Sequence, residues 1–210
     1  MYAASTYEEI ELQERKIENM EVVVFLFARI TDKDTLKEFE YIHYNSEGYC
    51  SIYAIGYTDD PNKTAENGYK PVKDVFDNTW SFSMKAYVDF KNKLEQRIKW
   101  KYSGETEVLI LQNNPWGKEP LNFQNYVAIN VTKGVHEGYI DSFQSFMESL
   151  VRSSKARVTA REVANDMANA RISVKGIIMG SIEECSKVPM PIKDIVKDRL
   201  FYRSANNFKS

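Results

Sequence analysis

The run from Glu21 to Ile30 (EVVVFLFARI) constrains the fold of this 210-residue chain more than any other segment. The run has the length of a strand, is rich in β-branched and aromatic residues, and shows no alternation of apolar and polar positions. Such a run is typical of a strand that is buried on both faces of a sheet. The rest of the chain therefore has to cover two faces, which favours a sheet packed with helices.

Three further segments have strand character, and helical segments separate them without a regular βαβ rhythm. The sequence therefore predicts an α+β fold, with a small mixed sheet packed with helices and a helical C-terminal segment. The strands are expected near residues 21–30, 49–57, 107–112 and 126–131.

Two segments have helical periodicity. Between Ile140 and Val151, apolar residues at i, i+3, i+6, i+7, i+10 and i+11 predict an amphipathic helix. A longer helix is expected from about Thr79 to Lys101. Its core-facing positions are predicted to be Met84, Val88, Leu94 and Ile98.

For other segments the sequence predicts the secondary structure less clearly, or predicts loops. Residues 35–44 fit a helix or a strand, and the sequence does not separate the two. Long loops are expected over 58–73 and 113–125, where turn-forming residues gather.

Charge is distributed unevenly along the chain. The net charge of −2 gives no strong overall field that would attract nucleic acid or an anionic membrane. However, residues 1–150 carry 16 Lys and Arg against 24 Asp and Glu, whereas residues 151–210 carry 12 against 6. This change predicts an acidic α+β body over 1–152 and a basic, mainly helical segment over 153–210, with a shared or a separate core.

The cysteines, the apolar runs and the first residues of the chain indicate the cellular compartment in which the protein is expected. Cys50 and Cys185 form neither a disulfide framework nor a zinc pattern, which favours a reducing compartment. The longest apolar run, Val22 to Ala28, has seven residues, whereas a membrane span needs about 20. The first residues lack the basic and apolar regions of a signal peptide. We expect a cytoplasmic protein that does not bind a membrane.

Sequence support for catalysis is weak. The two histidines, His43 and His136, lie outside any nucleophile-elbow motif, and Cys50 is more typical of a small buried side chain than of a nucleophile. The sequence contains no recognised metal-ligand motif and no phosphate-binding glycine loop. We therefore expect no cofactor, no metal and no catalytic residue, although an enzyme with an unrecognised site around these three residues stays open.

One arrangement resembles the core of restriction-type nucleases, which has a carboxylate on one strand and an E-x-K motif on the next. Glu107 begins one predicted strand and Lys133 follows another. Val131 stands where the E-x-K carboxylate would be, so the resemblance implies at most an inactive relative.

The strongest motif lies in the basic segment. Thr159 and Glu162 form a capping box, and the small and apolar residues that follow resemble a helix-turn-helix. The motif departs from the pattern at its turn, where Ala168 and Asn169 replace a glycine and an apolar residue. An alternating strand over 171–180 is the other interpretation. The resemblance implies a nucleic-acid interface formed by Arg152, Lys155, Arg157, Arg161, Arg171, Ser173 and Lys175.

Aromatic residues in and beside the two long loops are candidates for protein contacts. Exposed Trp and Tyr side chains bury a large area at low cost in entropy. The alternative is that these rings fold back onto the core. The candidates are Tyr57, Tyr69, Trp116, Phe123 and Tyr126.

Two function classes follow. The first is a non-enzymatic nucleic-acid-associated protein that binds DNA or RNA through its basic segment. The second is a structural component of a virion or another large complex, because regions of opposite charge suit contacts with another copy or a protein partner. Residues 157–163 also resemble a helix start in the portal proteins of short-tailed phages, and the Tyr-rich, Gly-poor composition is common in phage proteins.

Overall fold

The structure is a computed structural model that describes residues 1–19, 21–46, 48–65, 68–73, 76, 79–138, 140–156, 163 and 202–204. The elements in chain order are β1 (Tyr2–Ala4), α1 (Tyr7–Glu14), β2 (Val22–Phe27), α2 (Lys33–Lys37), α3 (Phe39–Ser46), β3 (Cys50–Ile55), β4 (Tyr57–Thr58), α4 (Pro61–Thr64), β5 (Tyr69–Pro71), β6 (Ser81–Ser83), α5 (Met84–Arg97), β7 (Glu107–Asn113), β8 (Leu121–Asn130), α6 (Val131–His136), α7 (Phe143–Ala156) and β9 (Tyr202–Ser204).

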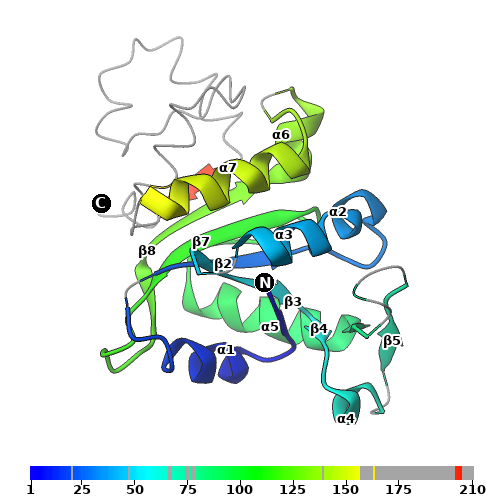
Figure 1. Ribbon diagram of the computed structural model, residues 1–210, viewed down its shortest axis with the longest axis horizontal. Coiled ribbons are helices and arrows are strands. Elements are labelled where there is room, and N and C mark those ends of the chain that lie inside the picture. The colour runs from blue at the N-terminus through cyan, green and yellow to red at the C-terminus, as the bar shows by residue number, and fades with distance from the viewer. Residues whose placement is uncertain are drawn as a thin grey trace.

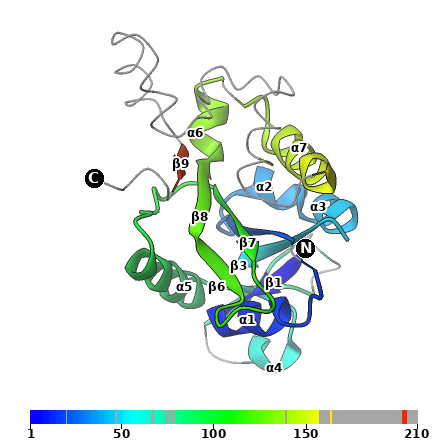
Figure 2. The same cartoon turned by 90° about the vertical axis from the view of Figure 1, so that its left-hand side faces the viewer.

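Six strands form one mixed sheet in the order β1-β3-β2-β7-β8-β9 (Figures 1 and 2). β1, β3 and β2 are parallel, whereas β7, β8 and β9 each run antiparallel to the strand before them in this order. β4, β6 and β5 form a second, antiparallel sheet. The predicted α+β class is confirmed, and each of the four expected strand positions holds a strand.

The central strand β2 is buried on both faces, as its apolar run predicts. All six of its residues are at most 1% exposed. Phe25 and Phe27 pack against Phe90 of α5, with ring centroids 5.5 and 6.2 Å apart. Figure 2 shows α1 and α5 on this side of the sheet and α2, α3 and α7 on the other. Each fully buried side chain of this size contributes about 1.5–3 kcal/mol, so this strand organises the core.

The two predicted helices have different outcomes. α7 confirms the amphipathic helix, and its residues Phe146, Met147 and Leu150 are fully buried. α5 is shorter than predicted. Met84 and Val88, which were expected in the core, are 48% and 38% exposed. At these two positions the prediction is wrong, because the aromatic rings of α5 determine its inward face, which consists of Tyr87, Phe90 and Leu94. Leu94 and Ile98 are buried, as predicted.

Gly56 divides the strand predicted over 49–57 into β3 and β4. Its φ of +87° lies in the left-handed region that favours glycine. Its N–H donates to the Ala4 carbonyl at 2.8 Å, and its carbonyl accepts from the Ser83 N–H at 2.9 Å. Gly56 therefore joins the larger sheet to the smaller one.

The C-terminal segment is described in part. α7 continues across the boundary predicted between Arg152 and Ser153, Val163 is fully buried, and β9 pairs with β8. The division into body and segment remains a prediction. The proposed helix-turn-helix lies outside the described residues, apart from Val163. Among the helices that the structure describes, none has the length and apolar character needed to cross a membrane.

Candidate nucleic-acid interface

α3 and α7 lie side by side over the same face of the sheet (Figure 1). Because α7 turns Leu150, Val151 and Ser154 toward the core, Arg152 and Lys155 point outward and are exposed. These two belong to the predicted nucleic-acid-binding set. The other members lie outside the described residues: Arg157, Arg161, Arg171, Ser173 and Lys175.

Three tyrosines stand on or directly after α3, and two of them, Tyr41 and Tyr49, interact with these cations. Phe39 and Ile42 of α3 are buried, and Tyr41 and Tyr44, three residues apart, are 38% and 74% exposed. Residues at this spacing are neighbours on a helix surface. Tyr49, in the turn after α3, is 43% exposed. We call Tyr41, Tyr49, Arg152 and Lys155 the α3–α7 surface.

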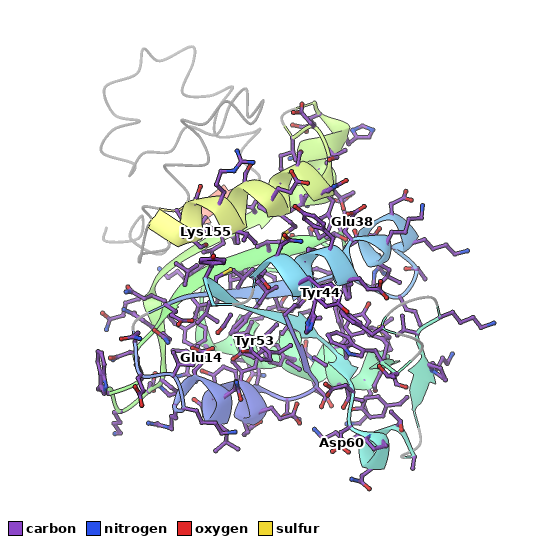
Figure 3. The ribbon with its side chains drawn as sticks, viewed as in Figure 1. Glu14, Glu38, Tyr44, Tyr53, Asp60 and Lys155 are labelled. Atoms are coloured by element: carbon purple, nitrogen blue, oxygen red, sulfur yellow. The ribbon has the colours of Figure 1, made fainter. Side chains whose placement is uncertain are left out.

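Direct interactions connect α7 with α3 and with the turn after α3. The Lys155 Nζ lies 4.1 Å from the centroid of the Tyr49 ring, which is a cation–π contact. Partial burial and the carboxylate of Glu148 raise the pKa of Tyr41, while the charge of Arg152 opposes that shift. Lys155 therefore contacts a tyrosine ring, and the charges of Glu148, Arg152 and Glu38 all act on Tyr41. Tyr44 and Lys155 are labelled in Figure 3.

Carboxylates near this surface accept hydrogen bonds from the protein itself. Glu40 accepts from the Phe76 N–H at 2.8 Å, and Glu148 accepts from Gln144 Nε2 at 3.0 Å. Lys155 lies in the last turn of α7, where the helix dipole favours a cation. Positive charge therefore lies at the C-terminal end of α7, while the carboxylates of Glu148 and Glu38 keep negative charge near Tyr41.

Most of the aromatic side chains predicted to contact partners pack inside the protein. Tyr57 and Tyr126 are 0% and 2% exposed, because both belong to strands rather than to loops, so neither is a surface contact. The Tyr57 hydroxyl donates to the Ala28 carbonyl at 2.9 Å. Tyr69 and Phe123 are half-buried. Trp116, in contrast, is 72% exposed in the turn between β7 and β8.

The surroundings of Cys50, His43 and His136, the residues considered for nucleophilic catalysis, indicate structural roles. Cys50 is buried, and this burial raises the pKa of its thiol to about 12. A thiol with this pKa is protonated at neutral pH, which disfavours a role as nucleophile. His43 Nδ1 lies 2.9 Å from the Met1 carbonyl oxygen, and His136 ends α6.

Glu107 and Lys133, the two residues of the nuclease-like arrangement, also have structural roles. Glu107 is buried in β7, where its carboxylate accepts from Trp100 Nε1 at 2.8 Å and from the Ser103 N–H at 3.1 Å. Burial raises the pKa of Glu107. Lys133 lies in the helix α6 rather than on a strand. The part of the chain that the structure describes contains no group of three or more His, Cys, Asp or Glu side chains that could hold a metal ion.

Comparison of the chain with protein-family models, curated proteins and solved structures gives no significant match. Its function is therefore inferred from the side chains described above. The tyrosines of α3 were not predicted as site residues, because the sequence left residues 35–44 undecided between helix and strand. The spacing of Tyr41 and Tyr44 indicates a shared face once that segment is known to be helical.

Proposed function

We propose that this chain is a non-enzymatic nucleic-acid-associated protein and that the α3–α7 surface is part of its interface. The observation that carries the proposal is the pair of exposed cations, Arg152 and Lys155, on the helix with which the basic segment begins. Contacts between basic side chains and phosphates supply most of the affinity in non-specific nucleic-acid binding. The excess of 12 basic over 6 acidic residues in 151–210 extends this charge along the sequence.

The double variant Arg152→Ala/Lys155→Ala tests the proposal. We expect it to bind a single-stranded oligonucleotide about tenfold more weakly than wild type at about 50 mM salt, because two phosphate contacts are lost. Fluorescence anisotropy of a labelled oligonucleotide measures the affinity. Both side chains are exposed, so the variant keeps its fold, which circular dichroism verifies.

A charge-matched control separates this surface from net charge. Lys37→Ala/Lys85→Ala removes two exposed lysines from α2 and α5, which pair with Asp34 and Asp89. The control is expected to bind nearly as well as wild type. Equal losses in both double variants would show that the α3–α7 surface is not the interface, and no binding by wild type at low salt would contradict the proposed function.

Trp116 favours a second candidate function, a component of a virion or another large assembly. The Arg15 guanidinium donates to the Lys118 carbonyl at 2.7 Å, which ties the turn that carries Trp116 to the end of α1. An exposed tryptophan on a braced turn is suited to anchor a protein interface.

The assembly function predicts self-association that depends on this ring. Size-exclusion chromatography with light scattering is expected to give a mass of several protomers for wild type and of one protomer for Trp116→Ala. A wild-type mass of one protomer at high concentration would count against self-assembly.

A further inference from the structure

The end of α1 places a buried carboxyl group directly before a residue that braces the turn between β7 and β8. We propose that Glu14 makes α1 a pH-sensitive clamp on this turn: when Glu14 ionises, the last turn of α1 leaves the sheet, and Arg15 releases the turn that carries Trp116. This inference concerns a conformational change and does not depend on the proposed function.

The surroundings of Glu14 suit a neutral carboxyl group. Its side chain is fully buried, and its Oε1 accepts a hydrogen bond of 2.6 Å from the Tyr53 hydroxyl (Figure 3). Its Oε2 is also buried and accepts no hydrogen bond within the part of the chain that the structure describes. Glu14 is the last residue of α1, where the helix dipole disfavours a negative charge. Because a buried, unbalanced charge is costly, ionisation favours the movement of Glu14 into water.

The groups that face Glu14 come from three neighbouring segments. They are Tyr53 and Ser51 on β3, Asn113 at the end of β7, and Glu21 directly before β2. None of these four side chains carries a positive charge. Burial raises the pKa of Glu14, the polar side chains of β3 and β7 oppose this rise, and the charge of Glu21 adds to it. The packed position of α1 therefore favours a protonated Glu14.

Arg15 connects the end of α1 to the turn between β7 and β8. Its Nη2 donates to the Lys118 carbonyl at 2.7 Å, and its Nη1 donates to the Gly117 carbonyl at 3.4 Å. Arg15 follows Glu14 directly in the chain, so these bonds break when the last turn of α1 leaves the sheet. The turn that carries Trp116 then loses its brace.

α1 has few buried side chains to hold it against the sheet. Of its eight residues, the buried ones are Tyr7, Ile10 and Glu14. Ionisation of Glu14 therefore affects one of three buried side chains. Elements with few buried contacts open at a lower cost in free energy than the rest of the core. We therefore expect α1 to open locally, while α7 stays packed.

Hydrogen exchange of the full chain, measured by mass spectrometry between about pH 5 and pH 8, tests the inference. The ratio of the wild-type exchange rate to that of Glu14→Gln is compared at each pH, because the intrinsic effect of pH on exchange cancels in it. In α1 this ratio is expected to rise by up to about tenfold for each pH unit, until the folded-state carboxyl has ionised. In wild type, amides of α1 are expected to exchange at least about tenfold faster than those of α7, after correction for intrinsic rates.

Two amides report the release of the turn. The Asn114 N–H donates to the Pro120 carbonyl at 2.7 Å, and the Gly117 N–H donates to the Asn114 carbonyl at 2.9 Å. Their exchange ratio is expected to rise with pH as in α1. In an Arg15→Ala background the ratio for these amides is expected to stay constant, whereas α1 still responds to Glu14→Gln. Glu18→Gln, on an exposed side chain, is the control and is expected to exchange as wild type does.

The outcomes separate the two parts of the inference. A ratio in α1 that does not rise with pH, or amides of α1 that exchange as slowly as those of α7, would overturn the release of α1. A response in α1 without one in the turn would overturn the coupling through Arg15. If Glu14→Gln does not fold, wild type alone gives the answer, because the exchange of α1 relative to intrinsic rates has to increase with pH.

Discussion

Gly56→Ala is expected to lower the free energy of unfolding by about 2–5 kcal/mol. An L-residue at a φ of +87° costs about 1–2 kcal/mol. The added Cβ would also lie 2.7 Å from the Cβ of Tyr87 and 2.9 Å from Cε2 of Phe82, and overpacking of this kind costs about 1–3 kcal/mol. The Cα of Tyr87 is 3.2 Å away, so the strain cannot be relieved by side-chain rotation alone.

Urea unfolding measures this effect, and Gly138→Ala is the matched control. Gly138 has a φ of +72°, but beyond Gly138 and its two chain neighbours no atom lies within 4 Å of the position of an added Cβ. The control is therefore expected to lose about 1–2 kcal/mol, from backbone strain alone. Equal losses at both positions would contradict the close packing of α5 against the junction of the two sheets.

Glu14→Gln is expected to remove a pH-dependent part of the stability. Glu14 ends α1, is fully buried, and accepts a hydrogen bond of 2.6 Å from the hydroxyl of Tyr53 on β3 (both labelled in Figure 3). Burial raises the pKa of Glu14 above its ordinary value of 4.5, although the hydrogen bond from Tyr53 opposes this shift. Folding therefore favours the protonated carboxyl group.

The direction of the pH effect follows from this raised pKa. Below pH 4.5, Glu14 is protonated in both states and makes its full contribution to stability. As the pH rises, the unfolded state loses its proton first, and the contribution decreases until the folded-state carboxyl has ionised as well. Wild type therefore loses stability relative to Glu14→Gln as the pH rises.

Urea unfolding between about pH 4 and pH 8 measures this difference. The free energy of unfolding of Glu14→Gln minus that of wild type is expected to increase by about 1.4 kcal/mol for each unit of pKa difference between the two states. Glu18→Gln makes the same chemical change on an exposed side chain and serves as the control. A difference that stays constant or decreases with pH would contradict the burial of an ionisable Glu14.

The parts of the fold predicted from sequence are those in which local pattern and burial agree. The apolar run of β2 identifies a strand covered on both faces, and the periodicity from Ile140 to Val151 identifies α7. Both patterns extend over several repeats of the strand or helix. The residues of each element are therefore enough to predict which of its sides are buried.

The remaining parts depend on contacts between distant segments. β1 has three residues and exists because Tyr2 to Ala4 pair with Tyr53 to Ile55, about fifty positions away. Gly56 ends a strand through its backbone conformation, which an apolar run does not reveal. Tyr57 and Tyr126 have the composition of exposed contact residues, but their place on strands buries them.

The residues of the proposed interface were predicted only in part, because some of them come together through contacts between distant segments. Arg152 and Lys155 could be found from the charge of the C-terminal segment and the periodicity of α7. Tyr41 and Tyr49 join them because α3 packs beside α7, and this pairing is tertiary. The basic residues can therefore be identified from the sequence, whereas the positions of the tyrosine rings relative to them depend on the fold.

The salt dependence of binding to a single-stranded oligonucleotide tests the central claim most directly. For wild type, the logarithm of the binding constant is predicted to fall linearly with the logarithm of the salt concentration, with a slope of about −0.7 for each phosphate contact. For Arg152→Ala/Lys155→Ala, the slope is predicted to be smaller in magnitude by about 1.4. Identical slopes for the two proteins, or binding that does not respond to salt, would contradict an interface at the α3–α7 surface.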